Sequence, residues 1–515
     1  MGSNRSIYAA AAVAVVGTGV VVSTPVTPAP IDVQARAVRL IDVDTAASPL
    51  GDGTALIYGG SGIPLPGQLY MDTADQLYLQ PNGFTGTLQS AFIPNGLRPF
   101  TGLNSLGFGT SLNQDQPIMI SEIENQIDAG GVSPDNPVVV FGYSQSSDAA
   151  SLIMQQLHDD GVPADDVHFV LVGDTNNPAG GGVSLFDFPA GNTGALSGED
   201  FPFQPATPSD LYPTDIYSIE YDSAADSPQY SSNLLSDLNS ELAFFLVHTT
   251  YLDISPEQIA SAQLLPGSED SAIDPCAACL TDYYMIPNDN LPLLEPLLLI
   301  PGAQPLYDLL EPDARILVNL GYGSITEGWN QGPANVPITF AASPPSSVLD
   351  QVPSALATGW QQGVTAFMND IAHPISYQDQ LAPLLPFENL MYTLGYTPEN
   401  PTFTEFIDAF LTYAGFPLPD LTASSSPADI ADAISKILSY DYTSLANFGD
   451  AINNLFTSLP AYDSEIFTSL VDAGDFSGAF LDPIAANTAL IPTDIIFGAG
   501  PLLAAIGTVV SLGEL

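Results

Sequence analysis

The serine at position 144 lies in a pattern typical of a catalytic nucleophile. The segment PVVVFGYSQS (137–146) predicts a buried strand that turns sharply into the helical run beginning at 145. A nucleophile on such a turn needs small residues two positions before and after it, because the backbone there is strained and crowded. Gly142 and Ser146 meet this requirement, although the usual second glycine is replaced by serine. The alternative, an ordinary glycine turn, is disfavoured by the flanking VVVF and the amphipathic helix.

A serine hydroxyl needs a general base, and four histidines are available. His158 ends the helix that follows Ser144, and His168 begins a strand, so both are expected far from the turn. His248 and His373 both leave room for the order Ser, then Asp or Glu, then His. We predict His248, because it follows the last clear strand, whereas His373 lies among appended helices.

The acid that orients the histidine is expected after a strand between the serine and His248. Asp174 ends the strand next after the turn, one strand too early. Asp222 and Asp226 follow the strand-like run DIYSIEY (215–221). We predict Asp226, because a loop aspartate reaches a histidine Nδ1 more readily, and keep Asp222, almost inside the strand, as the alternative. Either residue could instead only form a turn.

Two donors are needed for the oxyanion of an acyl-transfer reaction. One is the backbone N–H of Gln145, which follows the nucleophile. The other is predicted in YGGSGIP, where Ser61 offers its N–H and its hydroxyl, and Gly60 and Gly62 allow close backbone approach. A phosphate-binding loop is excluded there, because no Lys-Ser or Lys-Thr follows the glycines.

The elements that must position these residues alternate between strand and helix. Alternation of this kind predicts an α/β fold with a doubly wound, mainly parallel sheet, in which ligands bind beyond the carboxyl ends of the strands. The strands are expected at the start of 54–67 and at 137–142, 167–173 and 215–221, and the helices at 112–129 and 145–158. We expect a linker at 36–53, the hydrolase-like domain at 54–345 and a helical, Pro/Ser/Asp-rich region at 346–515.

The charge balance excludes several partners. The chain of 515 residues has 58 acidic and 6 basic residues, a net charge of −52, so it lacks the basic clusters that nucleic acids and anionic headgroups require. No metal or other cofactor is expected, and no partner protein can be deduced. Charged residues make up only 12% of the chain, so the surface must be largely uncharged polar, which suits a protein outside the cytoplasm.

The first 35 residues are typical of a secretory signal peptide. Arg5 precedes an uncharged apolar run at 7–22, and cleavage is expected after Ala35. A retained anchor helix is the alternative, but the run is short for a membrane span. Cys276 and Cys279 are then expected to form at most a local disulfide, because they lack the context of a redox or zinc site. The uncharged segment 496–513 is expected to be a buried helix pair, with membrane contact as the alternative.

Several separated motifs occur in an order that resembles the mycobacterial PE-PPE C-terminal domain, a cutinase-like group of serine α/β-hydrolases. They include TALIYGGSGIPLP, VVVFGYSQSS, LVGDTNNPAGG, YDSAADSPQYSSNLLSDLN, VHTTYLD and ILVNLGYG, and the resemblance covers about 54–325. It implies an esterase or acyltransferase, with the triad on Ser144, the YDSAAD segment and His248. Two departures are a serine at 227, where the family commonly has a large aromatic residue, and the expected lack of an N-terminal PE or PPE module.

These observations predict a secreted or cell-envelope serine esterase or lipase. The Leu/Pro-rich segment 285–325 is expected to shape an apolar acyl site, which favours an acyl ester or lipid substrate, and membrane or envelope association is compatible with it. Transfer of the acyl group to a cell-envelope glycolipid is the alternative that uses the same residues. A non-catalytic envelope binding protein is the alternative of a different class.

Overall fold

A seven-stranded sheet forms the centre of the computed structural model, which describes residues 50–98, 105–185, 205–272, 275–384, 452–494 and a few isolated positions. The strand order is β2-β1-β3-β4-β5-β7-β6. Only β6 runs antiparallel to its neighbour; all other pairs are parallel. The strands are β1 (Thr54–Ile57), β2 (Thr87–Ser90), β3 (Val138–Tyr143), β4 (Val167–Val172), β5 (Thr214–Ile219), β6 (Gln263–Leu264) and β7 (Thr281–Ile286). The predicted α/β class and mainly parallel sheet are therefore confirmed.

The central strands are buried on both faces, because helices cover both sides of the sheet. Every residue of β3, β4 and β5 is buried. Along β3, Val138 and Val140 pack into one core, while Val139 and Phe141 pack into the other. The edge strand β2 and strand β7 were not among the predicted strands; the sequence of β2, TLQS, has no continuous apolar run.

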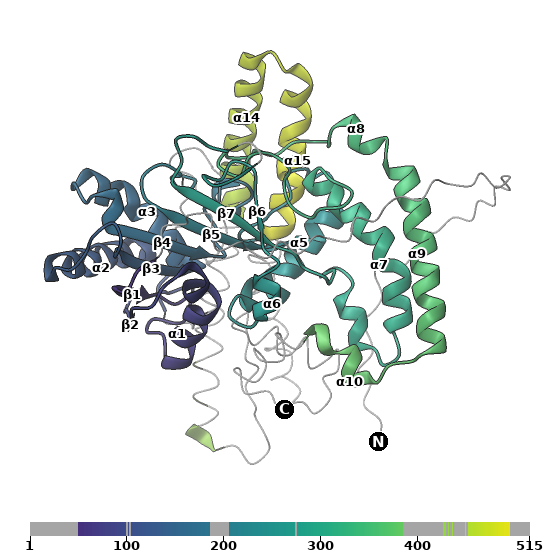
Figure 1. The fold of residues 1–515 in the computed structure, drawn as a ribbon. Coiled ribbons are helices and arrows are strands. Elements are labelled where there is room, and N and C mark those ends of the chain that lie inside the picture. Colours follow the sequence, from purple (N-terminus) through teal and green to yellow (C-terminus); the bar gives the residue numbers. More distant parts are fainter. Residues whose placement is uncertain are drawn as a thin grey trace, which may run out of the picture. The chain divides into compact units, whose positions relative to one another are not determined.

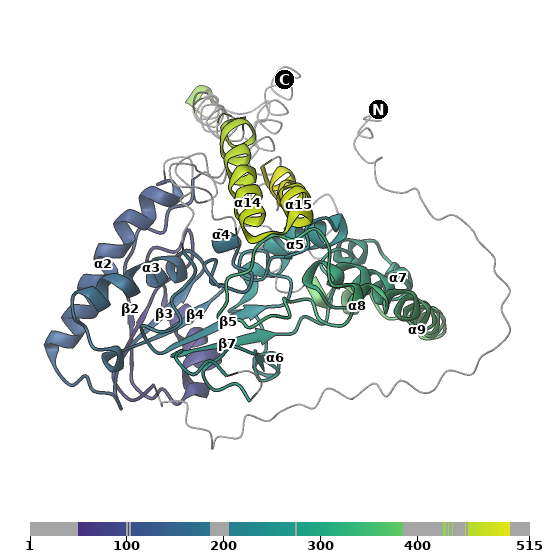
Figure 2. The same ribbon diagram turned by 90° about the horizontal axis from the view of Figure 1, so that it is seen from above.

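Helices α2 and α3 lie side by side on one face of the sheet (Figure 2). Helices α1 and α5 pack into the core on the other face. The α-helices of this part of the chain are α1 (Gln68–Ala74), α2 (Phe108–Ala129), α3 (Gln145–Asp159), α4 (Gly182–Leu185), α5 (Leu234–Leu246), α6 (Pro256–Ile259) and α7 (Gln304–Asn319). The predicted site residues lie in the loops and helix starts that follow the carboxyl ends of the central strands.

The region after residue 345 is helical where the structure describes it (Figure 1). It contains α8 (Ser346–Leu349), α9 (Val352–Ala372), α10 (Tyr377–Gln380), α14 (Leu459–Ala473) and α15 (Phe476–Asp494). Helix α9 packs closely on α7. A Cβ atom at Gly363 of α9 would lie only 2.2 Å from the Leu309 carbonyl oxygen of α7, so this close approach requires glycine. Helix α14 contacts the α/β part through Tyr462, whose hydroxyl donates to the Leu185 carbonyl at 3.0 Å.

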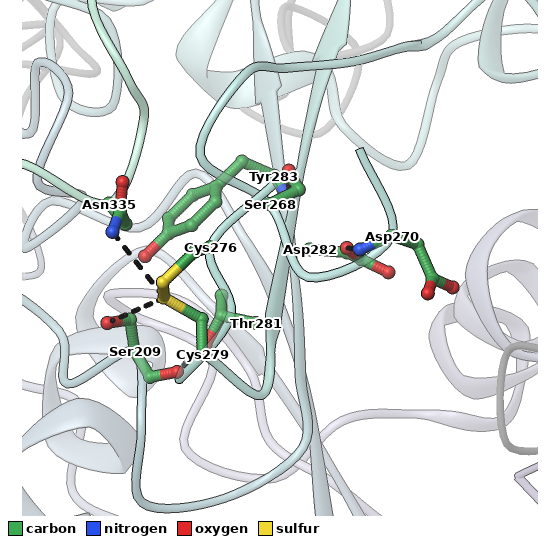
Figure 3. Close-up of a disulfide and its surroundings, with 9 residues drawn as sticks. All are labelled: Ser209, Ser268, Asp270, Cys276, Cys279, Thr281, Asp282, Tyr283 and Asn335. Carbon is green, nitrogen blue, oxygen red and sulfur yellow. Dashed lines mark hydrogen bonds between the residues drawn. A yellow bond between two sulfur atoms is a disulfide. The ribbon is translucent and has the colours of Figure 1, made fainter. Parts of the chain in front are cut away.

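A disulfide joins Cys276 and Cys279 in the loop before β7 (Figure 3). The buried Cys279 sulfur lies 3.5 Å from the Ser209 hydroxyl and 3.4 Å from the Asn335 side-chain nitrogen. The local disulfide that the sequence allows is thus formed. Because β7 begins at Thr281, the disulfide lies at the amino ends of the strands, away from the edge where the predicted site residues lie.

None of the described helices is long and apolar enough to cross a bilayer. The predicted signal segment at 7–22, the cleavage position after Ala35 and the segment 496–513 lie outside the described residues.

Candidate active site

Ser144 lies between β3 and α3 in a left-handed backbone conformation, with φ of 55° and ψ of −120°. Such a conformation is uncommon for a residue with a side chain and marks local strain. A Cβ at Gly142 would lie 3.0 Å from the carbonyl oxygen of Ser146, so the position two before the serine has no room for a larger residue. The partly exposed serine hydroxyl is thereby presented at the N-terminal end of a 15-residue helix.

Ser146 stabilises the turn, which explains why serine replaces the usual glycine. Its hydroxyl accepts a hydrogen bond from the Tyr143 N–H at 2.7 Å and lies 3.1 Å from the Tyr143 carbonyl oxygen. The Ser144 N–H donates to the Val172 carbonyl of the neighbouring strand at 3.0 Å. Both contacts tie the strained turn to the sheet.

His248 lies against the nucleophile in the short 3₁₀ helix His248–Thr250 that follows α5. Its Nε2 is 2.8 Å from the Ser144 hydroxyl oxygen, and the ring is buried. The Phe244 ring stacks on the imidazole with centroids 5.3 Å apart and an interplanar angle of 11°. Nε2 can therefore accept the serine proton while the ring is held in one orientation.

Asp222, the alternative in the sequence analysis, holds the other nitrogen of the imidazole. Its Oδ2 lies 2.9 Å from His248 Nδ1 and also accepts a 2.7 Å hydrogen bond from the Tyr251 hydroxyl. Its Oδ1 accepts from the Ala224 N–H at 2.9 Å, and the side chain is fully buried. Ser144, His248 and Asp222 thus form one continuous hydrogen-bonded chain.

The structure contradicts the preference for Asp226. Its Oδ2 accepts a hydrogen bond from the Tyr221 N–H at 2.9 Å, so the carboxyl group folds back on its own loop. Burial raises the pKa of the Asp226 carboxyl well above its ordinary value, and nearby Glu220 and Asp222 add to the shift. The reason is local geometry: β5 ends at Ile219, and Tyr221 has φ of 75°, so Asp222 lies beyond the strand and not inside it.

The predicted oxyanion donors lie together beside the serine. The Ser61 hydroxyl donates to the Gln145 side-chain oxygen at 2.7 Å, so that hydroxyl is engaged and the backbone N–H is the donor that Ser61 retains. No described residue accepts a hydrogen bond from the N–H of Ser61 or of Gln145. A Cβ at Gly60 would lie 3.6 Å from the Ser144 Cβ, so this loop runs directly past the nucleophile.

Several supporting residues were missed by the sequence analysis. Gly173 has φ of 60°, and a Cβ there would lie 3.1 Å from the Cε1 atom of His248, so only glycine leaves space for the imidazole. The Tyr143 hydroxyl donates to the His248 carbonyl oxygen. Tyr251 contacts Asp222 as described above. Of these, Gly173 and Tyr143 carried a local signal, since each adjoins a predicted strand end.

The other candidate residues lie elsewhere. His158 is exposed at the far end of α3, and His373 is exposed at the end of α9. His168 pairs with Asp215 at 3.0 Å near the amino ends of β4 and β5, the edge opposite Ser144. Asp174 is buried, and its Oδ2 accepts a 2.6 Å hydrogen bond from the Thr207 hydroxyl. Burial raises the pKa of Asp174 to about 6.

Within the described part of the chain, no group of three or more His, Cys, Asp or Glu side chains has the geometry to hold a metal ion. The hydrogen-bonded chain, with two backbone N–H groups beside it, has the parts required for nucleophilic acyl transfer: a nucleophile, a base, an orienting acid and oxyanion donors.

A family model described as the PE-PPE domain matches residues 85–323. Over 473 residues the chain is 34% identical to an "Uncharacterized PPE family protein PPE28" of Mycobacterium tuberculosis, covering 88% of this chain and 66% of the relative. It is 34% identical over 362 residues to "Esterase PE16" of the same organism, covering 67% of this chain and 63% of the relative. A match to "PE family protein PE3", also from that organism, is 34% identical over 352 residues and covers 66% of this chain and 69% of the relative.

The chain spans between 63% and 69% of the length of these curated relatives. The family model match and the 34% identity to a relative of which the chain covers 69% show the family. The chain therefore belongs to the PE-PPE domain family.

Proposed function

We propose that this protein is a serine esterase that hydrolyses acyl esters through an acyl-enzyme. The observation that carries the proposal is the hydrogen-bonded chain Ser144–His248–Asp222, with contacts of 2.8 and 2.9 Å. The relative named an esterase and the family match support a hydrolase of this kind.

In the first half of the reaction, the Ser144 Oγ attacks the ester carbonyl carbon, and its proton passes to His248 Nε2. The N–H groups of Gln145 and Ser61 stabilise the tetrahedral oxyanion. When the intermediate collapses, the bond to the alkoxy oxygen breaks, and Nε2 returns the proton to the departing alcohol. Asp222 accepts the Nδ1–H throughout and stabilises the imidazolium cation.

In the second half, water attacks the acyl-serine ester and gives its proton to His248 Nε2. Collapse breaks the bond to Ser144 Oγ, which recovers the proton, and a carboxylic acid is released.

We also propose that the enzyme acts outside the cytoplasm, in the cell envelope or the medium. The uncharged run at 7–22 behind a single arginine and the disulfide between Cys276 and Cys279 support this location. Mass spectrometry of the protein isolated from culture medium and envelope fractions tests it. Recovery only from the cytoplasm, with residues 7–22 retained, would contradict it.

The direct test of the catalytic proposal is labelling with a fluorophosphonate probe, which reacts with activated serines. The wild-type protein should be labelled and should hydrolyse p-nitrophenyl butyrate, whereas Ser144→Ala and His248→Ala should do neither. Ser347→Ala is the matched serine control, because Ser347 is exposed on α8 and takes no part in the nucleophile turn; it should be labelled as the wild type is. Labelling that persists in Ser144→Ala would move the nucleophile to another residue.

A further inference from the structure

Four exposed, large apolar side chains surround the loop that follows Ser61. Ile63 is 36% exposed, Leu65 58%, Leu69 81% and Phe92 50%. We call these four residues the apolar rim. They come from the loop after β1, from the start of α1 and from the segment after β2. The rim therefore borders the loop that carries a proposed oxyanion donor.

The backbone beneath the rim is fixed by hydrogen bonds between its two segments. The Pro64 carbonyl accepts from the Ile93 N–H at 3.1 Å, and the Pro66 carbonyl accepts from the Ser90 hydroxyl at 2.6 Å.

A buried asparagine holds the other side of the loop. The Asn95 side-chain nitrogen donates to the Gly59 carbonyl at 2.7 Å and to the Ile63 carbonyl at 3.2 Å, and the Gly62 N–H donates to the Asn95 carbonyl at 2.8 Å. The exposed side chains are thus presented by an ordered framework, which lowers the entropy lost when they are buried against a partner.

The two chain segments that carry the rim are uncharged, although the chain as a whole is very acidic. Residues 53–71 and 76–97 contain no Asp, Glu, Lys, Arg or His, although the whole chain carries a net charge of −52. The nearest carboxylate along α1 is Asp72, which accepts a 2.8 Å hydrogen bond from Gln68. An uncharged apolar surface fits an uncharged partner, and the acidity of the rest of the chain opposes approach to anionic lipids.

We infer that the apolar rim docks the enzyme onto an electrically neutral lipid surface, such as an ester droplet. This inference rests on the proposed esterase function, because docking at the rim brings an aggregated ester to the loop beside Ser144. A lipid surface is favoured over a protein partner because the rim is continuous with the catalytic loop and has no charged residues to specify a partner.

Binding can be measured without catalysis, in a Ser144→Ala background, by flotation with triolein droplets coated with phosphatidylcholine. The variant Leu65→Asp/Leu69→Asp should bind at least about tenfold more weakly, because two apolar side chains are replaced by charged ones. The matched control is Met368→Asp/Ile371→Asp on α9, whose side chains are 61% and 59% exposed and which carries the same added charge. The control should bind as the parent does.

The same substitutions in the active enzyme should lower hydrolysis of the droplets while leaving hydrolysis of dissolved p-nitrophenyl acetate within about twofold of wild type, since neither Leu65 nor Leu69 belongs to the triad or supplies an oxyanion donor. A milder variant, Leu65→Ala/Leu69→Ala, gives the same test if the charged variant does not fold. Unchanged droplet binding in the rim variants would overturn the inference, as would equal loss in the α9 control. A wild-type protein that binds droplets but hydrolyses neither ester would instead contradict the proposed function.

Discussion

Replacing Asp222 by asparagine tests the catalytic chain most sharply. Asp222 Oδ2 receives two donors, His248 Nδ1 and the Tyr251 hydroxyl, while Oδ1 receives the Ala224 N–H. An asparagine has one acceptor oxygen and one NH₂ group, so at least one of these donors must face another donor. If the NH₂ group faces His248, the wrong tautomer is favoured and Nε2 cannot accept the serine proton. If the oxygen faces His248, the tautomer survives but the negative charge that stabilises the imidazolium is lost.

The expected loss in kcat is about 10³- to 10⁴-fold, the upper figure being that of a serine protease with the same substitution in its triad. This corresponds to about 4–5.5 kcal/mol of transition-state stabilisation. The assay is steady-state hydrolysis of p-nitrophenyl butyrate, together with thermal unfolding to show that the variant is folded.

Asp226→Asn is the matched control, because it makes the same chemical change four residues away. Among the described residues, the Asp226 carboxyl group accepts one hydrogen bond, from the Tyr221 N–H. Burial raises the pKa of this carboxyl, so a neutral amide can replace it. Its kcat should stay within about threefold of wild type, since no contact to the histidine is removed. A dead Asp226→Asn enzyme beside a nearly normal Asp222→Asn enzyme would refute this reasoning.

Three other outcomes are expected. Tyr251→Phe should lower the free energy of unfolding by about 1–3 kcal/mol, measured by denaturant unfolding, because the Asp222 carboxylate loses a donor and the Ile219 N–H loses its acceptor; an unchanged free energy of unfolding would contradict this. Replacing Cys276 and Cys279 by alanine should cost at most about 2 kcal/mol by the loop-entropy relation for so short a loop, with kcat unchanged, as measured by denaturant unfolding and ester hydrolysis. Burial, with nearby carboxylates, raises the pKa of Asp282 to about 7, so the folded state binds this proton more tightly than the unfolded chain, and the free energy of unfolding falls as pH rises from about 4 through 7. The Asp282→Asn variant should therefore be about 1–2 kcal/mol more stable than wild type at pH 8 and not at pH 4. Equal melting temperatures of the two proteins at pH 8 would contradict this.

The serine turn could be predicted from sequence because its determinants are local. Gly142 and Ser146 lie within two residues of Ser144, and the apolar strand before it and the helix after it are continuous in the chain. The position of His248 followed from the order of residues in this fold, which also depends only on the sequence.

The choice between Asp222 and Asp226 could not be made in the same way. The sequence pattern predicts a strand that extends to residue 221, but β5 ends at Ile219 and the backbone turns at Tyr221. That turn points one carboxylate at the histidine and the other at the loop itself. A shift of two residues in a strand end is beyond what a propensity pattern defines, and here it decides which acid meets the imidazole.

Residue types alone do not make the site, as the opposite edge of the sheet demonstrates. There His168 Nε2 lies 3.0 Å from Asp215 Oδ2, close to the 2.9 Å between His248 and Asp222. No described hydroxyl group is hydrogen-bonded to the second ring nitrogen of His168, whereas His248 Nε2 contacts Ser144 at 2.8 Å. The difference arises from the direction of the parallel strands. At their carboxyl ends, a serine with positive φ can precede a helix and direct its hydroxyl at a histidine. At their amino ends the chain is entering the sheet, and no helix begins there. The same His–Asp pair is therefore part of a nucleophilic chain at one edge and only a buried polar contact at the other.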